Sequence, residues 1–209
     1  MIFFFVIPTH AWSPPHDKFR IGEIDELDAR RAREVSDIYS VLESRQMRLD
    51  PPDIWKLAQC IQEESEKRAF NPLLVLAIIE VESRFDHRAV SPRGARGLMQ
   101  IRPIAAAAVA EEVGLPHGKA AKIFDDPIVN VRIGTAYLRH LRDLFTDLKL
   151  TLVAYNWGPT RLRQALATKQ SIPRIYADKV ILAQRAIESN RMRETPLQAR
   201  TEPRQSEMG

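Results

Sequence analysis

Apolar residues in the middle of the chain recur three and four positions apart, in segments that often begin at a proline. This spacing places apolar side chains on one face of an α-helix. The connections between the segments are short, and no segment shows the strict alternation of a half-buried β-strand. The pattern predicts an all-α domain over residues 53–190.

One segment differs from the others because it has no polar face. Asn71-Pro72 is a helix start signal, a capping residue followed by a first-turn proline. Residues 73–79, which follow, are all apolar. A helix that is apolar all round belongs in the middle of a core. This predicted central helix ends at Glu80 and Glu82, so carboxyl groups lie at its exit.

The same signals predict the other helices of this domain, and residues 86–97 are expected to form a loop. The helices are a first one marked by Ile54, Leu57 and Ile61, an alanine-rich one from Pro103 through Glu112, one that starts at Asp126-Pro127 and includes Phe145, a short one over residues 150–156 ended by Gly158-Pro159, and a last one over about 173–190.

Three segments flank this domain. Residues 1–15 begin with an apolar run, Ile2–Ile7, that is similar to the trailing end of an export signal, with a disordered start as the alternative. The run is too short to cross a membrane, which takes about 20 residues. Residues 16–52 are densely charged and predict one or two amphipathic helices, packed on the domain or loosely tethered to it. Residues 191–209 are polar and predicted to be disordered.

The charge and the cysteine count narrow the function classes only a little. A net charge of +4 suits an anionic partner such as a nucleic acid, a membrane surface or a wall polymer, or simply a slightly basic surface. No arginine-rich helix with interleaved aromatics is present, so no nucleic-acid partner is expected. Cys60 is the single cysteine, lies in an apolar-periodic stretch and is expected in the core. The histidines are scattered, so neither a metal site nor a cofactor is expected.

Glu82 is the first candidate for chemistry. Apolar surroundings raise the pKa of a carboxyl because they disfavour its charged form, and the C-terminal end of a helix acts in the same direction. A carboxyl that is protonated near neutral pH can act as a general acid. Glu80 points to another face, about 200° away around the helix. The alternative is that Glu82 is an ordinary solvated surface group.

Several motifs follow Glu82 in order, and together they resemble one family. They are Glu82-Ser83-Arg84-Phe85, Ser91–Ala95, Gly97–Ile101 with Pro103, the set Asn130, Gly134, Tyr137 and Leu138, the block Ala154–Pro159, and Tyr176 with Val180. Over about residues 71–180, the chain is similar to the Slt-type lytic transglycosylases of the lysozyme-like superfamily. The resemblance implies a lysozyme-like helical domain, here with an N-terminal charged helical extension.

The resemblance also implies roles for single residues. It makes Glu82 the catalytic acid, Ser91 a residue that orients the substrate's N-acetyl group, and Met99 and Gln100 the floor of the sugar cleft. It makes Tyr155 a tyrosine with its hydroxyl near the acid, gives Tyr176 a similar part, and leaves Asn156 as a further substrate contact. Residue types alone leave other roles open: Met99 and Tyr137 could be core residues, and Asn130 and Asn156 could satisfy buried backbone groups.

The implied activity is non-hydrolytic cleavage of the β-1,4 bond between N-acetylmuramic acid and N-acetylglucosamine in peptidoglycan, which leaves 1,6-anhydro ends. Such an enzyme would work in the periplasm or cell envelope after export and would need no metal. One alternative is a lysozyme-like hydrolase, with Asp86 as the nearest second carboxylate. Another is a wall-binding or scaffold module that keeps the cleft without turnover, or one whose charged residues 17–48 dock on a secretion or conjugation apparatus.

Three positions depart from the family's usual pattern. Arg102 stands where a methionine is usual, Ala105 where a threonine is usual, and Trp157 where an alanine is commonest. The residues usual before the last tyrosine are also absent. None of these positions is the proposed acid, so they concern the fit of the substrate more than the chemistry.

Overall fold

The structure is a computed structural model that describes residues 21–114 and 124–194. Its helices are α1 (Ile21–Ser44), α2 (Pro51–Lys67), α3 (Pro72–Ser83), α4 (Pro103–Ala107), α5 (Pro127–Leu144), α6 (Leu148–Trp157), α7 (Pro159–Ala167) and α8 (Ile175–Glu194). Within these ranges, β-structure is limited to two isolated bridges in the loop before α4. The predicted all-α fold is confirmed.

Helix α3 lies in the middle of the core, as its apolar sequence predicts. The seven side chains from Leu73 to Ile79 are all buried. The Asn71 side chain caps the helix by accepting a hydrogen bond from the Leu73 backbone N–H at 2.8 Å. Helices α2 and α8 pack against α3. The core is therefore built around the helix that ends at Glu82.

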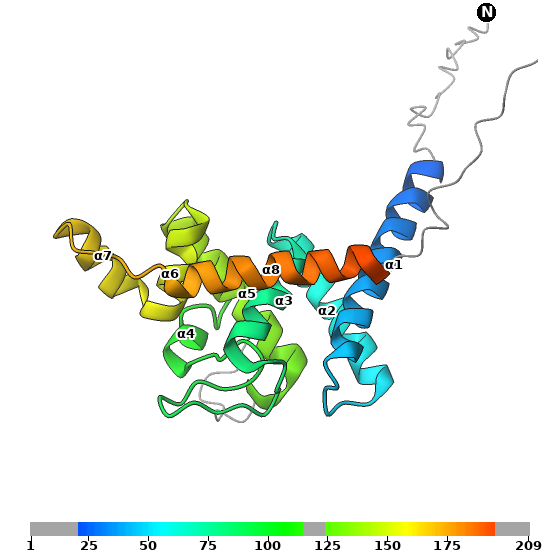
Figure 1. Cartoon of the computed structure of the whole chain (residues 1–209), viewed down its shortest axis with the longest axis horizontal. Coiled ribbons are helices and arrows are strands. Elements are labelled where there is room, and N and C mark those ends of the chain that lie inside the picture. The colour runs from blue at the N-terminus through cyan, green and yellow to red at the C-terminus, as the bar shows by residue number, and fades with distance from the viewer. Residues whose placement is uncertain (1–20, 115–123, 195–209) are drawn as a thin grey trace, which may run out of the picture.

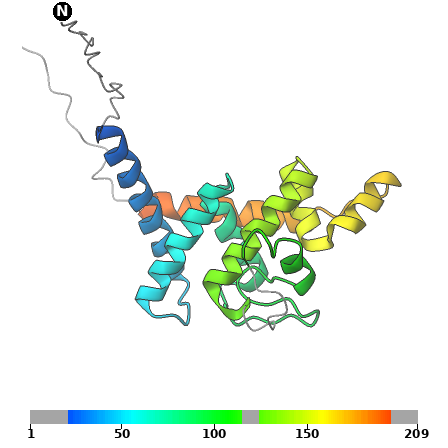
Figure 2. The same ribbon diagram turned by 180° about the vertical axis from the view of Figure 1, so that it is seen from behind.

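Helix α8 crosses the length of the molecule. Figures 1 and 2 show it running from the α6 end of the molecule to α1, and it contacts α3, α6 and α1 on the way. Ala177, Val180 and Ile187 are its buried residues. The sequence predicted a last helix over about 173–190, and the observed helix extends to Glu194. The predicted polar tail would thus begin four residues later.

Helix α1 is packed on the body of the domain, which is the first of the two alternatives that its sequence left open. Val35, Ile38 and Leu42 are buried in the same hydrophobic core as α3. Helix α1 packs along α2, and an ion pair of 2.6 Å joins Asp37 to Arg191 near the end of α8. The charged extension is therefore one helix that contributes to the core.

Two expectations about the helices were wrong. The alanine-rich helix predicted through Glu112 ends at Ala107 and is followed by turns, which bring the Glu112 carboxylate to 2.9 Å from the buried guanidinium of Arg68. This tertiary ion pair overrides local helix propensity. Pro159 was read only as the end of the preceding helix, but it also begins α7. Proline is favoured in the first turn because its missing N–H has no partner to lose there.

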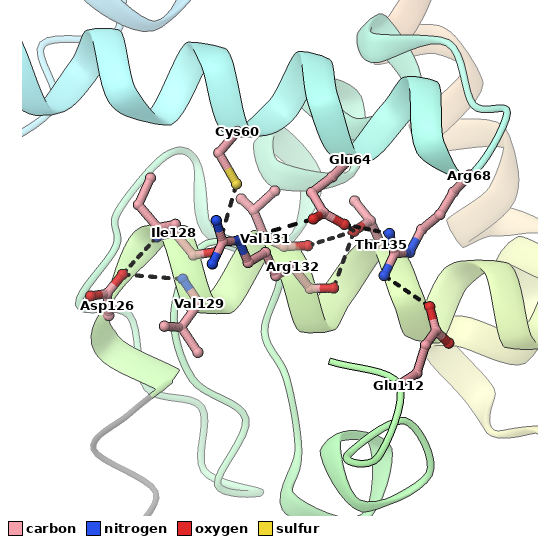
Figure 3. A network of polar contacts seen from close by, with 10 residues as sticks. All are labelled: Cys60, Glu64, Arg68, Glu112, Asp126, Ile128, Val129, Val131, Arg132 and Thr135. Atoms are coloured by element: carbon pink, nitrogen blue, oxygen red, sulfur yellow. Dashed lines mark hydrogen bonds and ion pairs between the residues drawn. The ribbon is translucent and has the colours of Figure 1, made fainter. Parts of the chain in front are cut away.

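A buried polar network joins α2 to α5 (Figure 3). Arg68 is only 3% exposed and pairs with both Glu64 and Glu112. The Thr135 hydroxyl of α5 donates to the Val131 carbonyl at 2.8 Å, and its oxygen lies 3.5 Å from the Glu64 carboxylate. Removing one partner of a buried pair leaves an uncompensated charge, which costs about 3–5 kcal/mol. The network therefore holds α2 and α5 in register.

Cys60 is a buried residue of the same α2–α5 interface, as expected. Its thiol lies 3.8 Å from the Ile128 carbonyl oxygen. Burial raises its pKa to about 12. A thiol with so high a pKa stays protonated and unreactive, so Cys60 acts as a small core residue.

The expectations for residues 1–15 and for the tail beyond Glu194 lie outside the described residues. Within residues 21–114 and 124–194, no helix is both long enough and apolar enough to cross a membrane.

Replacing Leu42 by alanine should lower the free energy of unfolding by about 2–5 kcal/mol, because a fully buried leucine leaves a cavity in a shared core. The matched control is Leu27→Ala on the same helix, where the side chain is 47% exposed and little is lost. Denaturant unfolding of the full chain measures both. Equal effects of the two substitutions would show that α1 is not part of the cooperative core.

Candidate active site

Glu82 lies in the last turn of α3, next to a sharp reversal of the chain. Arg84 and Phe85 both have positive φ angles, 51° and 64°, which are uncommon for residues other than glycine. The Phe85 side chain is buried and anchors the reversal. The backbone N–H of Arg84 donates to the Glu80 carbonyl and closes the helix. The chain therefore leaves the direction of α3 directly after Ser83, and the Glu82 carboxyl lies beside a cavity.

This first cavity has a volume of about 330 Å³ and opens between α3, α6 and α8. Its lining residues are Val81, Glu82, Val153, Asn156, Trp157, Pro173, Ile175, Tyr176 and Lys179. The Tyr176 hydroxyl donates a hydrogen bond of 2.6 Å to Oε1 of Glu82. Residues that are 94 positions apart in the chain are thereby joined at one carboxyl group.

Burial raises the pKa of Glu82 from its ordinary value of 4.5 to about 7, and the hydrogen bond from Tyr176 opposes part of that rise. Burial disfavours the carboxylate, whereas the phenol hydroxyl stabilises it. At neutral pH the group is therefore close to half protonated. A carboxyl in this state can both donate and accept a proton.

A second cavity of about 570 Å³ adjoins the first. Gln100, Ile101, Tyr137 and Tyr155 are among its lining residues, and it shares Asn156 and Trp157 with the first cavity. The two cavities therefore adjoin at the C-terminal end of α6, and Glu82 lines the first of them; the pair is called the cleft below.

Tyr155 faces the backbone on the floor of this cleft. Its hydroxyl donates to the Met99 carbonyl at 2.8 Å, and its ring packs on Tyr137 at a centroid distance of 5.7 Å. Burial, followed by the nearby charge of Glu82, raises its pKa well above the ordinary value. The phenol therefore stays neutral. Tyr155 lies near the acid, but Tyr176 is the tyrosine that bonds to it.

The loop that carries Met99 and Gln100 is held in place by Asn130. The Asn130 side chain accepts from the Met99 N–H at 2.7 Å and donates to the carbonyls of Arg96 at 2.9 Å and Phe124 at 2.8 Å. A Cβ on Gly97 would lie 2.3 Å from Nδ2 of Asn130, and Gly97 has a φ of 74°. Only glycine fits here, so Asn130 and Gly97 serve the backbone rather than a ligand.

The structure divides the remaining predicted site residues into two groups. Asn156 and Gln100 line the cleft, and the Gln100 amide donates to the carbonyls of Ala89 and Gly97. Ser91 and Met99 line neither cavity. The Ser91 hydroxyl accepts from the Ala95 N–H at 3.0 Å, and Met99 is fully buried.

Met99 packs against Gly134 of α5 so closely that a Cβ there would lie 2.3 Å from the methionine sulfur.

Trp157 and Lys179 both line the cleft, and the sequence reasoning gave neither of them a site role. Trp157 was noted only as a departure, although its place beside Asn156 at the end of a helix is a usable signal. Lys179 was not considered, although it follows Tyr176 by three residues, which places both on one side of a helix.

Glu82 is the only carboxylate among the described residues that line the two cavities. Asp86 lines neither, and its carboxylate accepts from the Arg88 N–H at 3.0 Å. Glu80 lies 2.9 Å from the guanidinium of Arg45 and is likewise outside the cleft. In the described part of the chain, no group of three or more His, Cys, Asp or Glu side chains could hold a metal ion.

Comparison with known proteins agrees with this geometry. Residues 59–176, more than half of the chain, match the family model described as the transglycosylase SLT domain. The soluble lytic murein transglycosylase of Escherichia coli K12 is 34% identical over 109 residues, which cover 47% of this chain and 17% of that protein. The transglycosylase of Enterobacteria phage PRD1 is 32% identical over 99 residues, 47% of this chain and 34% of that protein.

Among solved structures, the 70 kDa soluble lytic transglycosylase of E. coli is similar with a TM-score of 0.56 and 26% identity, over 78% of this chain and 30% of that one. The chain thus spans only a minor part of the length of these relatives.

Replacing Tyr176 by phenylalanine should raise the pKa of Glu82 above about 7, because the hydrogen bond that stabilises the carboxylate is lost while burial remains. NMR titration of the Glu82 side chain would measure this change. Tyr137→Phe is the control, because Tyr137 lies in the second cavity and does not touch Glu82. A fall in the pKa in Tyr176→Phe would contradict the assigned hydrogen bond.

The stability of the protein should respond to Glu82 in a pH-dependent way. The folded pKa of about 7 exceeds the ordinary 4.5, so the wild type loses stability as pH rises from about 4.5 to 7, by roughly 3 kcal/mol in total. Glu82→Gln removes that loss, and its stability relative to wild type should grow between pH 4 and pH 8. Thermal unfolding at both pH values measures the difference. A constant difference would show that the Glu82 carboxyl is not held in its protonated form.

Proposed function

The chain belongs to the transglycosylase SLT domain family, and we propose that it is a lytic transglycosylase acting on peptidoglycan. The proposed reaction cleaves the β-1,4 bond between N-acetylmuramic acid and N-acetylglucosamine and leaves a 1,6-anhydro end. The observation that carries the proposal is the single Glu82 carboxyl in a sugar-sized cleft, with a pKa of about 7 and a hydrogen bond from Tyr176.

In this proposal Glu82 acts first as an acid and then as a base. Protonated Glu82 donates its proton to the glycosidic oxygen, and the bond from that oxygen to C1 of the muramic acid breaks. The substrate's own N-acetyl group stabilises the positive charge at C1. The Glu82 carboxylate then accepts the proton of the muramic acid 6-hydroxyl, whose oxygen forms the new bond to C1. The proton count at Glu82 is thereby restored.

The pKa of Glu82 suits both halves of this cycle. A general acid or base is most effective when its pKa lies near the working pH. Burial supplies a carboxyl that is still protonated before the reaction, and the Tyr176 hydroxyl stabilises the carboxylate between the two proton transfers. The two opposed influences on one group therefore support the dual role.

The alternative of a lysozyme-like hydrolase finds less support. Most glycoside hydrolases place two carboxyl groups on either side of the scissile bond. The described cleft residues provide one, and Asp86 is bonded to its own turn instead. An intramolecular 6-hydroxyl needs no second carboxylate to activate it.

The substrate also implies a location. Peptidoglycan lies outside the cytoplasmic membrane, and the E. coli relative is named a soluble lytic murein transglycosylase. We therefore propose that the protein works in the cell envelope after export. Docking of the charged face of α1 on a secretion or conjugation apparatus stays a prediction.

Replacing Glu82 by glutamine should lower turnover by at least about 10²–10⁴-fold, because the only carboxyl among the described lining residues of the cleft is lost. Release of soluble muropeptides from purified peptidoglycan, followed by mass spectrometry, would measure this. Glu80→Gln is the matched control, since it removes a carboxyl from the same end of α3 outside the cleft.

The wild-type products should carry 1,6-anhydro ends, which are lighter than reducing ends by one water. Reducing ends would identify the protein as a hydrolase, and an active Glu82→Gln variant would refute the assignment of the acid.

A further inference from the structure

The second cavity of the cleft is strongly cationic. Arg93, Arg102 and Arg161 line it, and its lining residues include no aspartate or glutamate. The arginines come from three places: the loop before α4, the residue preceding α4, and the first turn of α7. Three like charges converge on one cavity, although their mutual repulsion is unfavourable.

These three side chains have no carboxylate partner within the described residues. The guanidinium of Arg161 lies over the Trp157 ring, 4.4 Å from its centroid. The charge of Arg102 acts on Tyr137, where it opposes the rise in pKa caused by burial. By contrast, nearby Arg96 makes two hydrogen bonds to Asp125, at 2.8 and 2.6 Å. Arg93, Arg102 and Arg161 therefore keep their hydrogen-bond donors available for a ligand.

The backbone adds to the positive potential. Gly158, Pro159 and Thr160 also line the cavity, at the start of α7, a helix of nine residues. The N–H groups of a first helical turn have no partner within the helix, and the aligned peptide dipoles favour an anion there. The side chains and the helix start thus favour a ligand of the same sign.

The position of the cavity relates such an anion to the substrate of Glu82. Asn156 and Trp157 line both cavities, so a ligand long enough to extend from Glu82 past these two residues would reach the arginines. Neutral sugar rings can accept hydrogen bonds from arginines but carry no charge to match three of them. Carboxylates carry that charge, and a guanidinium can bind them through two parallel hydrogen bonds.

We propose that Arg93, Arg102 and Arg161 form a subsite for carboxylates carried by the muramic acid of the substrate. These are the free lactyl carboxylate where the peptide stem is absent, or the carboxylates of the stem itself. The inference rests on the proposed function for the identity of the substrate. It also assigns a purpose to Arg102, which stands where the family usually has an uncharged methionine.

The test is a binding measurement in the Glu82→Gln background, where no turnover consumes the ligand. Calorimetry would compare three glycan strands: one with acidic stem peptides, one with the stem carboxylates amidated, and one with the stems removed and the lactyl carboxylates free. The added substitutions are Arg102→Gln and Arg161→Gln together. The matched control is Arg33→Gln with Arg185→Gln, two exposed arginines on α1 and α8 outside the cavity.

The double variant should bind the carboxylate-bearing strand about tenfold more weakly, since each exposed ion pair contributes up to about 1 kcal/mol and 1.4 kcal/mol is a factor of ten. Its affinity for the amidated strand should change much less. The parent's preference for the acidic strand should also shrink as the salt concentration rises. If the double variant loses affinity only for strands with acidic stems, the stem supplies the carboxylate. If it loses affinity for stem-free strands, the lactyl group supplies it.

The subsite is refuted if the double variant binds all three strands as the parent does. It is also refuted if affinity for the amidated strand falls equally, because the effect would then come from lost packing. Failure of the proposed function looks different: the wild-type protein would release no anhydro products, while selective binding of carboxylates persisted.

Discussion

The burial of residues 73–79 of α3 is the constraint on which the rest of the structure depends. A helix with seven consecutive apolar residues must be covered on every side, and α2 and α8 pack against it. Burying a leucine or isoleucine side chain contributes about 1.5–3 kcal/mol, so this helix is a large part of the stabilisation of the core. Its central place means that whatever follows Ile79 emerges from the core at a defined point.

Glu82 lies at the point where the chain leaves the core. The carboxyl is close enough to the apolar core for burial to raise its pKa, and far enough along the helix to reach the cleft. Burial and the hydrogen bond from Tyr176 shift the pKa of Glu82 in opposite directions, and neither alone would leave that pKa near neutral pH. Complete burial without Tyr176 would favour the protonated form, and a solvated carboxyl would be an ion. The covering helix α8 supplies the missing hydrogen bond, so packing and chemistry depend on the same contact.

Helix caps and apolar runs in the sequence predicted much of this helical architecture. The caps at Asn71 and Asp126 and the apolar run after Asn71 predicted α3 and the start of α5, and the structure confirms both. Contacts between distant segments were not predictable. Whether Tyr155 or Tyr176 reaches Glu82 depends on how α8 lies over α3, and no local pattern records that. The length of α4 likewise depends on the pairing of Glu112 with Arg68.

The residues that match the family's motifs lie at different distances from the cleft. Asn130, Gly97 and Met99 position the loop from behind, whereas Gln100 and Asn156 face the cleft. The same reasoning extends to α1. Tyr176 lies at the start of α8, and α1 contacts the far end of the same helix, where Asp37 pairs with Arg191. A charged extension that looks peripheral in the sequence thus shares the hydrophobic core in which α3 is buried.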